Sequence, residues 1–183
     1  MNNLKVTSKK LNGKFFSRDA KTVAQELLGK VLVRRVGKEI LKARIVETEA
    51  YFGGEDPASR ACKNGNLKEV MEDEPGTILV YGVHNNWLIN FITGSRGKAE
   101  AVLLRALEPL NFNARCNGPG LLTKALNIDK SFHNKEIIGN PEIWIVENNE
   151  KFEIEEAFRV GVTKDLPEKL RFYVRENKHV SRK

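Results

Sequence analysis

The sequence predicts a single α+β domain built around a mainly antiparallel sheet. Its 183 residues suffice for one hydrophobic core but leave little room for a second. Short runs rich in β-branched and aromatic residues, separated by turn residues, outnumber the helical segments. No internal repeat, low-complexity segment or flexible linker divides the chain. We therefore expect one domain over residues 1–183, with basic segments at both ends.

Two helices are expected to flank the sheet. Residues 17–29 combine a candidate N-cap, Ser17 or Asp19, with a terminating Gly29. A second, shorter helix over residues 121–126 follows a Gly-Pro-Gly sequence that breaks the preceding structure. The apolar side of the first helix is formed by Val23, Leu27 and Leu28.

The expected strands are joined largely by tight turns. The first two would pair as a hairpin around Gly37-Lys38-Glu39, and further turns fall at Asn85-Asn86 and at residues 94–97. Because hairpins join antiparallel neighbours, most of the sheet should be antiparallel. The expected strands cover residues 30–36, 43–51, 77–83, 87–93, 101–107, 142–146 and 171–175.

Composition narrows the class of protein. Apolar residues make up 40% and charged residues 30% of the chain, as in soluble globular proteins. No apolar run approaches the roughly 20 residues that span a bilayer. The N-terminus lacks the apolar core of a secretory signal. We expect no membrane association and an intracellular location, cytoplasmic or associated with the nucleoid.

Cysteine and histidine are too sparse to indicate a metal centre. Cys62 and Cys116 are too few for a disulfide framework, and we expect both to be reduced. The histidines, His84, His133 and His179, have none of the short spacings of zinc ligands. We expect neither a metal nor a cofactor.

The charge of the chain favours a polyanionic partner. The net charge is +7 and the pI is about 9.4, and cations that neutralise phosphates release condensed counterions when they bind nucleic acid. The alternative is a protein whose basic faces are simply solvated. The two ends would either contact phosphates or form disordered tips. Their basic residues are Lys5, Lys9, Lys10 and Lys14 at one end and Arg175, Lys178, Arg182 and Lys183 at the other.

The most informative segment is Ile-Val-Glu-Thr-Glu-Ala-Tyr at residues 45–51. In a strand, the two-residue period places Ile45, Glu47, Glu49 and Tyr51 on one face. Either both carboxylates point inward toward a site, or they are surface glutamates at an exposed strand end.

A second strand supplies a possible partner for these carboxylates. In residues 102–109, VLLRALEP, the same alternation places Arg105 with Leu103 and Leu107. An arginine on an apolar face is costly without a partner. Glu49 would satisfy it, and Arg105 would in turn orient Glu49 and keep it ionised as a general base. The alternative is an ion pair with only a structural role.

Several blocks together resemble the alkyladenine, or 3-methyladenine, DNA glycosylase family. The resemblance extends from about residue 15 to residue 146 in the family's order, and the combination is far more specific than one short motif. The blocks are LLGKVLVRR at 27–35, VETEAY at 46–51, PGT at 75–77, VLLRALEP at 102–109 and CNGPGLLTKALNIDKSF at 116–132.

This resemblance implies a fold, a substrate and a mechanism. The sheet would be curved and would carry a β-hairpin that enters the minor groove of double-stranded DNA, and the protein would be a monomer. It would excise damaged purines in base excision repair, leaving a free base and an abasic site without a covalent lysine intermediate. By motif position, Glu49 would deprotonate water and Arg105 would position it. Tyr51 and Tyr81 would stack on the extruded base, and Asn90 would gate substituents on the purine.

Elementary chemistry agrees with these roles. Extruding a base from a duplex costs about a few kcal/mol, which stacking on aromatic rings partly recovers. Bond cleavage builds positive charge on the sugar, and an ionised carboxylate stabilises that charge while it activates water. General-base catalysis typically contributes roughly 100- to 10,000-fold. Because an alkylated purine already carries positive charge, it is also the better leaving group.

One departure from the family affects the base pocket. Arg60 stands where the family commonly has a histidine that lines this pocket. A cation there would contact DNA or the extruded base. It therefore bears on the range of substrates, especially bulky etheno adducts.

A second departure affects the hairpin at residues 80–90, where the family usually has a more aromatic run around a Tyr-Gly pair. The residue that wedges into the gap left by the extruded nucleotide is then His84 or a neighbouring asparagine, and we assign it to His84. The alternative is a turn histidine with no special role. Trp87 begins an apolar strand and is expected in the core.

Two other functions remain to be distinguished. A non-catalytic module of the same fold would bind distorted DNA but would lack the base or the water-positioning residue, whereas Glu49 and Arg105 are both present. An RNA-binding or transferase-associated domain with a curved sheet would need neither residue.

Overall fold

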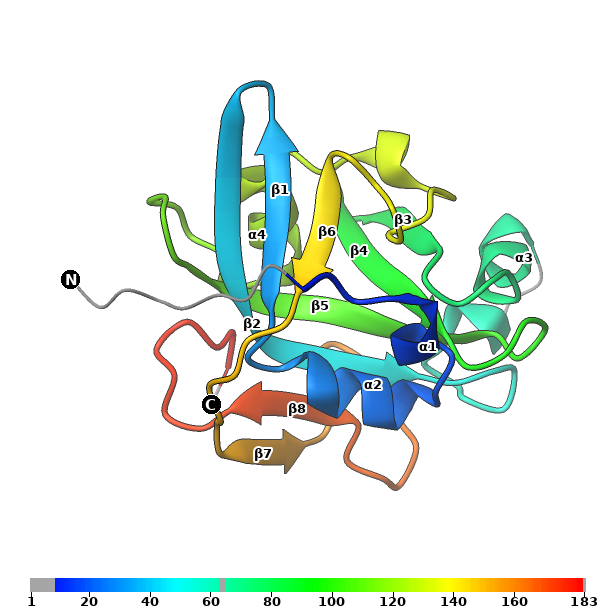
Figure 1. Cartoon of the computed structure of the whole chain (residues 1–183). Helices are drawn as coiled ribbons and strands as arrows, with labels where there is room; N and C mark the ends of the chain where they lie inside the picture. The colour runs from blue at the N-terminus through cyan, green and yellow to red at the C-terminus, as the bar shows by residue number, and fades with distance from the viewer. Residues whose placement is uncertain (1–8, 63–64, 183) are drawn as a thin grey trace.

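The computed structural model describes residues 9–62 and 65–182, which form a curled, mainly antiparallel sheet with helices packed against it (Figure 1). The sheet has eight strands, with the main order β3-β4-β5-β2-β1-β6. This confirms the expected α+β class. The strands are β1 (Val31–Val36), β2 (Glu39–Tyr51), β3 (Ile78–Val83), β4 (Asn86–Thr93), β5 (Glu100–Pro109), β6 (Ile143–Val146), β7 (Ile154–Ala157) and β8 (Arg171–Val174).

The long strand β2 is the branch point of the sheet. Its first half pairs with β1, whereas its second half pairs with β8 across residues 47–49 and with β5 on its other edge. All described strand pairs are antiparallel. The carboxylates of β2 therefore lie where β5 and β8, strands far apart in sequence, meet the same short segment.

The helices are short, and they cover the sheet at different places. The two longer ones are α2 (Ala20–Leu27) and α4 (Pro119–Ala125). The remaining helical elements are α1 (Gly13–Phe16) and α3 (Asn66–Met71), with the single 3-10 turns η1 (Arg60–Cys62) and η2 (Lys130–Phe132). Among the described residues, no helix combines the length and apolar character needed to cross a bilayer.

Helix α2 begins later than expected. Ser17 ends α1 instead, and Asp19 caps α2 by accepting a hydrogen bond of 2.9 Å from the backbone N–H of Thr22. Gly29, with a φ of +85°, turns the chain toward β1. The expected apolar side is buried, and the helix is fixed to β2 because the Thr48 hydroxyl donates to the carbonyl of Ala24 at 2.8 Å.

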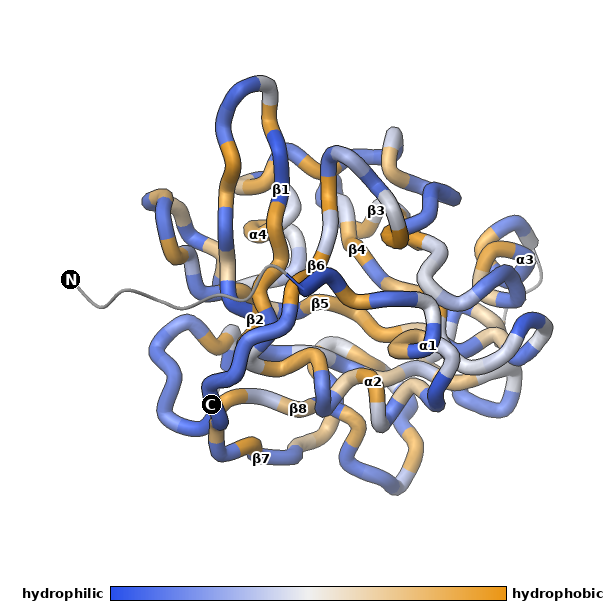
Figure 2. Tube along the Cα trace, viewed as in Figure 1, coloured by the Kyte–Doolittle hydropathy of each residue, from blue (hydrophilic) through white to orange (hydrophobic). Residues whose placement is uncertain are grey.

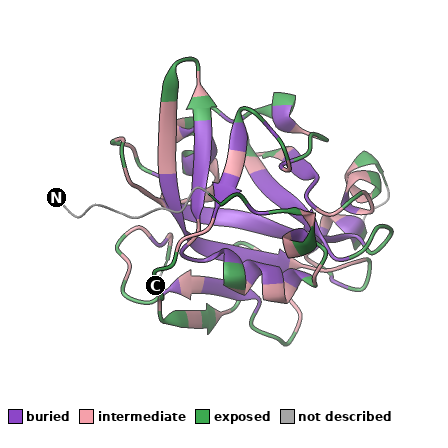
Figure 3. Ribbon diagram, viewed as in Figure 1, coloured by how far each residue is buried: buried purple, intermediate pink, exposed green. Residues whose placement is uncertain are grey.

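The core follows the hydropathy of the strands. Apolar residues run along the central strands, and the loops around them are hydrophilic (Figure 2). The same strands are buried, whereas the far end of the β1–β2 hairpin and the edge strand β7 are exposed (Figure 3). The main cluster joins Val23 and Leu27 of α2 with Ile45 of β2 and Phe91 of β4.

A register shift where β2 meets β5 corrects the expected alternation. The pairing shifts between Ile45 and Glu47 and again between Glu47 and Thr48. Ile45 and Leu107 both belong to the main core, so they do not share a face with Glu49 and Arg105 as the simple period predicted. A bulge of this kind re-aims side chains, and here it lets Glu47, Glu49 and Arg105 converge.

Other boundaries shift by a few residues. The β3–β4 turn consists of His84 and Asn85, both with positive φ, rather than Asn85-Asn86. Helix α4 begins earlier than expected because Pro119 occupies its first turn, where a missing N–H costs nothing. The helices α1 and α3 and the strand β7 were not expected from the sequence.

Candidate active site

Glu49 is a buried carboxylate at the branch of the sheet. It is fully shielded from solvent. Its Oε1 accepts the backbone N–H of Val160 at 2.7 Å and lies 3.3 Å from Nη1 of Arg105, while Oε2 accepts the Tyr51 hydroxyl at 2.8 Å. Glu47 and Glu49 are both buried and thus not surface residues, and the expected pairing of Glu49 with Arg105 is confirmed.

Burial raises the pKa of Glu49 above its ordinary value. The Arg105 guanidinium and the hydrogen bonds from Val160 and Tyr51 lower this pKa, but they do not offset burial. Arg105 thus acts in the expected direction, since it favours the ionised form of Glu49, while burial opposes it. A carboxyl with a raised pKa is better matched to general-base catalysis near neutral pH.

Arg105 forms ion pairs with Glu47 and Glu49 of β2. Its Nε lies 3.4 Å from Glu47, and 10% of its side chain remains exposed. Glu47 is completely buried and also binds Arg171 of β8 at 2.8 Å. The C-terminal segment closes this cluster, because the N–H and hydroxyl of Ser181 both donate to Glu47, at 2.6 and 3.0 Å.

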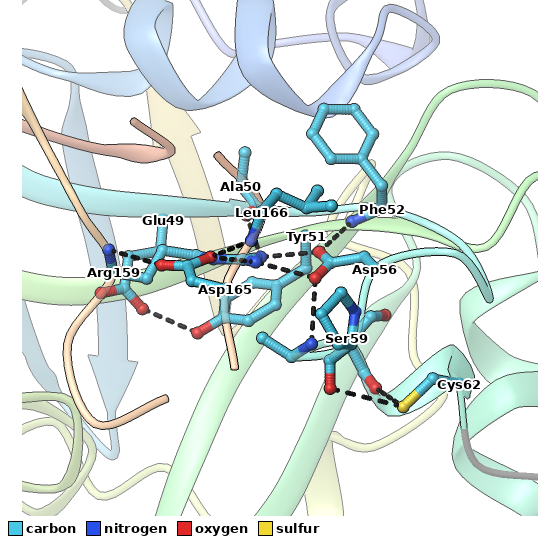
Figure 4. A network of polar contacts seen from close by, with 12 residues as sticks. Glu49, Ala50, Tyr51, Phe52, Asp56, Ser59, Cys62, Arg159, Asp165 and Leu166 are labelled. Carbon is cyan, nitrogen blue, oxygen red and sulfur yellow. Dashed lines mark hydrogen bonds and ion pairs between the residues drawn. The ribbon is translucent and has the colours of Figure 1, made fainter. Parts of the chain in front are cut away.

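A second arginine fixes the Tyr51 ring from behind. The guanidinium of Arg159 lies 4.5 Å from the centre of this ring. It binds Asp56 through two contacts of 2.6 and 2.7 Å and Asp165 through contacts of 2.6 and 2.9 Å, and it donates to the carbonyl of Ala50. Figure 4 shows this network converging beneath Tyr51 and continuing into the loop at residues 52–62. Burial and the adjoining Glu49 raise the pKa of Tyr51, which keeps its hydroxyl protonated as a donor.

Next to Tyr51 is a narrow pocket with a cavity volume of only about 10 Å³. Asn90, buried on β4, donates to the carbonyl of Leu79 at 3.2 Å. Arg60 enters from η1, with its guanidinium carbon 4.8 Å from the centre of the Tyr81 ring. The structure therefore brings together every residue expected to bind the purine. The pocket is lined by Tyr51, Ala58, Arg60, Met71, Leu79, Tyr81, Asn90 and Ala101.

The β3–β4 hairpin presents its turn to solvent. His84 and its neighbours Asn85 and Asn86 are exposed. Trp87 is 37% exposed, so the expectation that it lies in the core is wrong. Trp87 stands opposite Gly82, which has no side chain to cover the indole ring, and this end of the hairpin extends beyond the core.

Some of the basic residues near the two ends of the chain form contacts within the protein. Lys5 and Lys183 lie outside the described residues. Residues 9–14 are not a loose tip, since Leu11 donates to the carbonyl of Ile145 at 2.9 Å and Lys10 lies 4.6 Å from the Trp144 ring centre. At the other end, Arg175 is paired with Glu153 and Glu155.

The remaining polar residues give no sign of a metal centre within the part of the chain that the structure describes. No group of three or more potential ligands among His, Cys, Asp and Glu occurs there. Cys62 and Cys116 are both free, as expected.

Sequence reasoning missed the residues of the C-terminal segment that complete the site. These are Val160, whose N–H binds Glu49, and the clamp residues Arg159 and Asp165. Asp56 lies in the sequence Asp-Pro-Ala-Ser at residues 56–59. Nothing in that sequence indicates that Asp56 binds Arg159, which is 103 residues away.

Comparison with known proteins identifies the family. The methylpurine-DNA glycosylase family matches residues 14–178, which extends the resemblance beyond the expected limit of residue 146. A protein of Aeropyrum pernix is 42% identical over 178 residues, covering 92% of this chain and 91% of its own. One of Borrelia garinii is 39% identical (92% and 98%), and one of Clostridium perfringens is 37% identical (95% and 100%). Each is named "Putative 3-methyladenine DNA glycosylase". The chain therefore belongs to the methylpurine-DNA glycosylase family, and it is a DNA glycosylase, a hydrolase of N-glycosyl bonds that acts in DNA repair.

Proposed function

We propose that this protein extrudes damaged purines such as 3-methyladenine from double-stranded DNA and cleaves their N-glycosidic bonds with water activated by Glu49. The observation that carries this proposal is the buried Glu49, which touches Arg105 on one side and the wall of an aromatic pocket, through Tyr51, on the other. We further propose that it acts as a monomer at the nucleoid and needs neither metal nor cofactor.

The chemical step needs one base and no covalent intermediate. Glu49 takes a proton from water, and the water oxygen bonds to C1′ of the sugar. The bond from C1′ to the purine nitrogen breaks, and the base leaves with the electron pair. Arg105 is suited to position the water because its guanidinium lies beside Glu49 and retains some exposure. The Val160 N–H fixes the carboxylate during this step.

The pocket is suited to a purine. Tyr51 and Tyr81 offer aromatic rings for stacking, which is worth about 1–3 kcal/mol per base. Arg159 contacts the Tyr51 ring but does not line the pocket, so it supports the ring from outside. Asn90, held by Leu79, would gate substituents at the purine edge.

We assign the DNA-intercalating residue to His84. It stands at the turn of an exposed hairpin, where a side chain can enter the gap that the extruded nucleotide leaves. Basic residues such as Lys9 and Lys10 would contact phosphates, so the affinity for DNA should fall as salt rises. An affinity that does not change between low and moderate salt would contradict this part of the proposal.

The alternative is a module that recognises damage without cleaving. The test uses duplexes that each carry one purine lesion, incubated with the protein in EDTA and then treated with alkali to break abasic sites. We expect strand breaks only after alkali, reduced by roughly 100- to 10,000-fold in Glu49→Gln. Glu26→Gln, on the exposed side of α2, serves as the matched control and should retain activity. Tight DNA binding without abasic sites on any lesion would contradict catalysis and leave the binding module.

A further inference from the structure

The guanidinium of Arg60 occupies the place where a purine would stack on Tyr81. It lies 4.8 Å from the centre of the Tyr81 ring and lines the pocket together with Tyr51 and Asn90. A cation over an aromatic face is held by the ring quadrupole. A base that enters must therefore move this group aside.

Arg60 cannot move far from the pocket, because the loop that carries it is anchored. Its neighbours Ser59 and Ala61 are 2% and 4% exposed, and the Ala61 N–H donates to the Ser59 hydroxyl at 3.1 Å. Asp56 accepts the N–H groups of Phe52 and Ala58 at 3.0 Å each and binds Arg159 (Figure 4). The cation thus stays next to an incoming base even after displacement.

The charge of Arg60 is not neutralised within the described residues, none of whose carboxylates forms an ion pair with it. The other two arginines near the pocket differ in this respect. Arg105 is paired with Glu47 and Glu49, and Arg159 with Asp56 and Asp165. Arg60 is therefore the source of uncompensated positive charge on the described pocket wall.

We propose that Arg60 is a specificity-determining residue that favours neutral purine lesions bearing a carbonyl oxygen over cationic N-alkylpurines. This inference rests on the proposed function. An N-alkylated purine is a cation and meets like-charge repulsion from the guanidinium. A neutral base such as hypoxanthine meets no such repulsion; its C6 carbonyl can accept a hydrogen bond from the guanidinium, as can that of 7-methylguanine, so the two bases differ in charge. Arg60 shifts the preference between neutral and cationic bases but does not by itself set their rates of excision, because a cationic base remains the better leaving group.

The test compares two bases in otherwise identical duplexes, hypoxanthine and 7-methylguanine. Single-turnover rate constants are measured for the wild type, Arg60→Gln and Arg60→Lys, with thermal unfolding as a check of folding. We expect Arg60→Gln to raise the ratio of 7-methylguanine to hypoxanthine excision by about tenfold. Arg60→Lys keeps the charge and should leave the ratio within about threefold of wild type.

The control variant is Arg96→Gln, which removes the same charge from an exposed loop and should leave the ratio unchanged. A ratio that is unchanged or lower in Arg60→Gln would overturn the inference, as would an equal shift in Arg60→Lys or in Arg96→Gln. If the wild type excises neither base, the inference is overturned, while the proposed function is decided separately by the other purine lesions. If it excises both and the ratio does not respond, only the role of Arg60 is wrong.

Discussion

Two buried arginine clusters lie on either side of Tyr51, and they are built differently. Around Arg159 the contacts to Asp56 and Asp165 are 2.6–2.9 Å, and the side chains of Arg159 and Asp56 are fully buried. Around Arg105 the contacts to Glu47 and Glu49 are 3.3–3.4 Å, and 10% of the Arg105 side chain is exposed. The Arg159 cluster, with its shorter contacts, suits a support, whereas the more open Arg105 cluster suits the water-positioning role proposed for it.

The pKa values follow the same division. Asp56 has a pKa below its ordinary value, because the hydrogen bonds from Arg159 and from the backbone outweigh the effect of burial. Glu49 has a pKa above its ordinary value, because burial outweighs Arg105. The protein therefore lowers the pKa of the carboxylate in the supporting cluster and raises the pKa of the carboxylate proposed as the base, which is the direction expected for a group that exchanges a proton.

The largest expected effect is on stability, and it separates the two clusters. Asp56→Asn leaves Asp165 to balance the buried Arg159 without Asp56, and it should cost about 3 kcal/mol, the lower end of the range for removing one member of a buried pair. Glu49→Gln should cost much less stability while it abolishes excision. Chemical denaturation of both variants at neutral pH measures this difference. Equal losses of stability would show that the two clusters have the same role.

The same variant predicts a pH dependence with a definite sign. Because the folded-state pKa of Asp56 is lowered, its stabilisation is fully present above the ordinary value of 3.8 and is lost as the pH falls through the folded-state pKa. The stability difference between wild type and Asp56→Asn should therefore narrow in acid. Denaturation curves from pH 7 downward, over the range in which the wild type stays folded, measure it. A difference that widened would contradict the assignment.

The contrast between the two arginine clusters also explains which site residues could be predicted from the sequence. Glu49, Tyr51 and Arg105 sit in strands, where alternation and a local motif indicate both their faces and their partners. Arg159 and Asp165 lie in a loop with no periodicity, and Asp56, the other carboxylate that binds Arg159, is 103 residues away from it. The N–H of Val160 has no sequence signal at all, since every residue other than proline has this group.

The elements of the fold were also predictable only in part. Strongly periodic strands such as β1, β2 and β5 were found within a few residues of their bounds. The bulge in β2 was not, because it depends on how β5 pairs with it rather than on either strand alone. Strand β7 was missed because its Ile154 is exposed at an edge and its neighbours are glutamates.

The next prediction concerns the open cluster and the pH dependence of catalysis. Glu49 must be ionised to act as a base, so the rate falls as the pH drops through its pKa. Arg105→Gln removes the strongest influence that lowers this pKa, so the acid limb of the single-turnover rate should move to higher pH. The overall rate should also fall, by roughly tenfold or more, because water is no longer positioned. Arg96→Gln is the control, and an acid limb that stays in place or moves to lower pH would refute the role of Arg105 in tuning Glu49.

A smaller effect is expected where the C-terminal segment supports Arg105. The Ser181 hydroxyl donates to Glu47 at 3.0 Å and lies 3.4 Å from Nε of Arg105. Ser181→Ala removes two partly buried hydrogen bonds, one donated to Glu47 and one accepted from Arg105, and should cost about 1–2 kcal/mol of stability, while the main-chain contact of Ser181 to Glu47 remains. Ser17→Ala, whose exposed hydroxyl donates to the Gly13 carbonyl, is the matched control. A decrease of several kcal/mol in the free energy of unfolding would instead mean that the C-terminal segment supports the fold in the way proposed for the Arg159 cluster.

The smallest effect tests whether burial, rather than ion pairing itself, makes the two clusters important. Lys68 of α3 and Glu72, which caps the end of this helix, form an exposed pair at 3.8 Å, four residues apart. Such pairs contribute about 0.3–0.5 kcal/mol, because water screens the charges and both side chains lose rotamer freedom. Lys68→Ala should therefore change the unfolding free energy by less than about 0.5 kcal/mol, and high salt should reduce the change further. If instead Lys68→Ala cost as much as Asp56→Asn, desolvation would not be what distinguishes the buried arginines, and the division between support and active cluster would lose its physical basis.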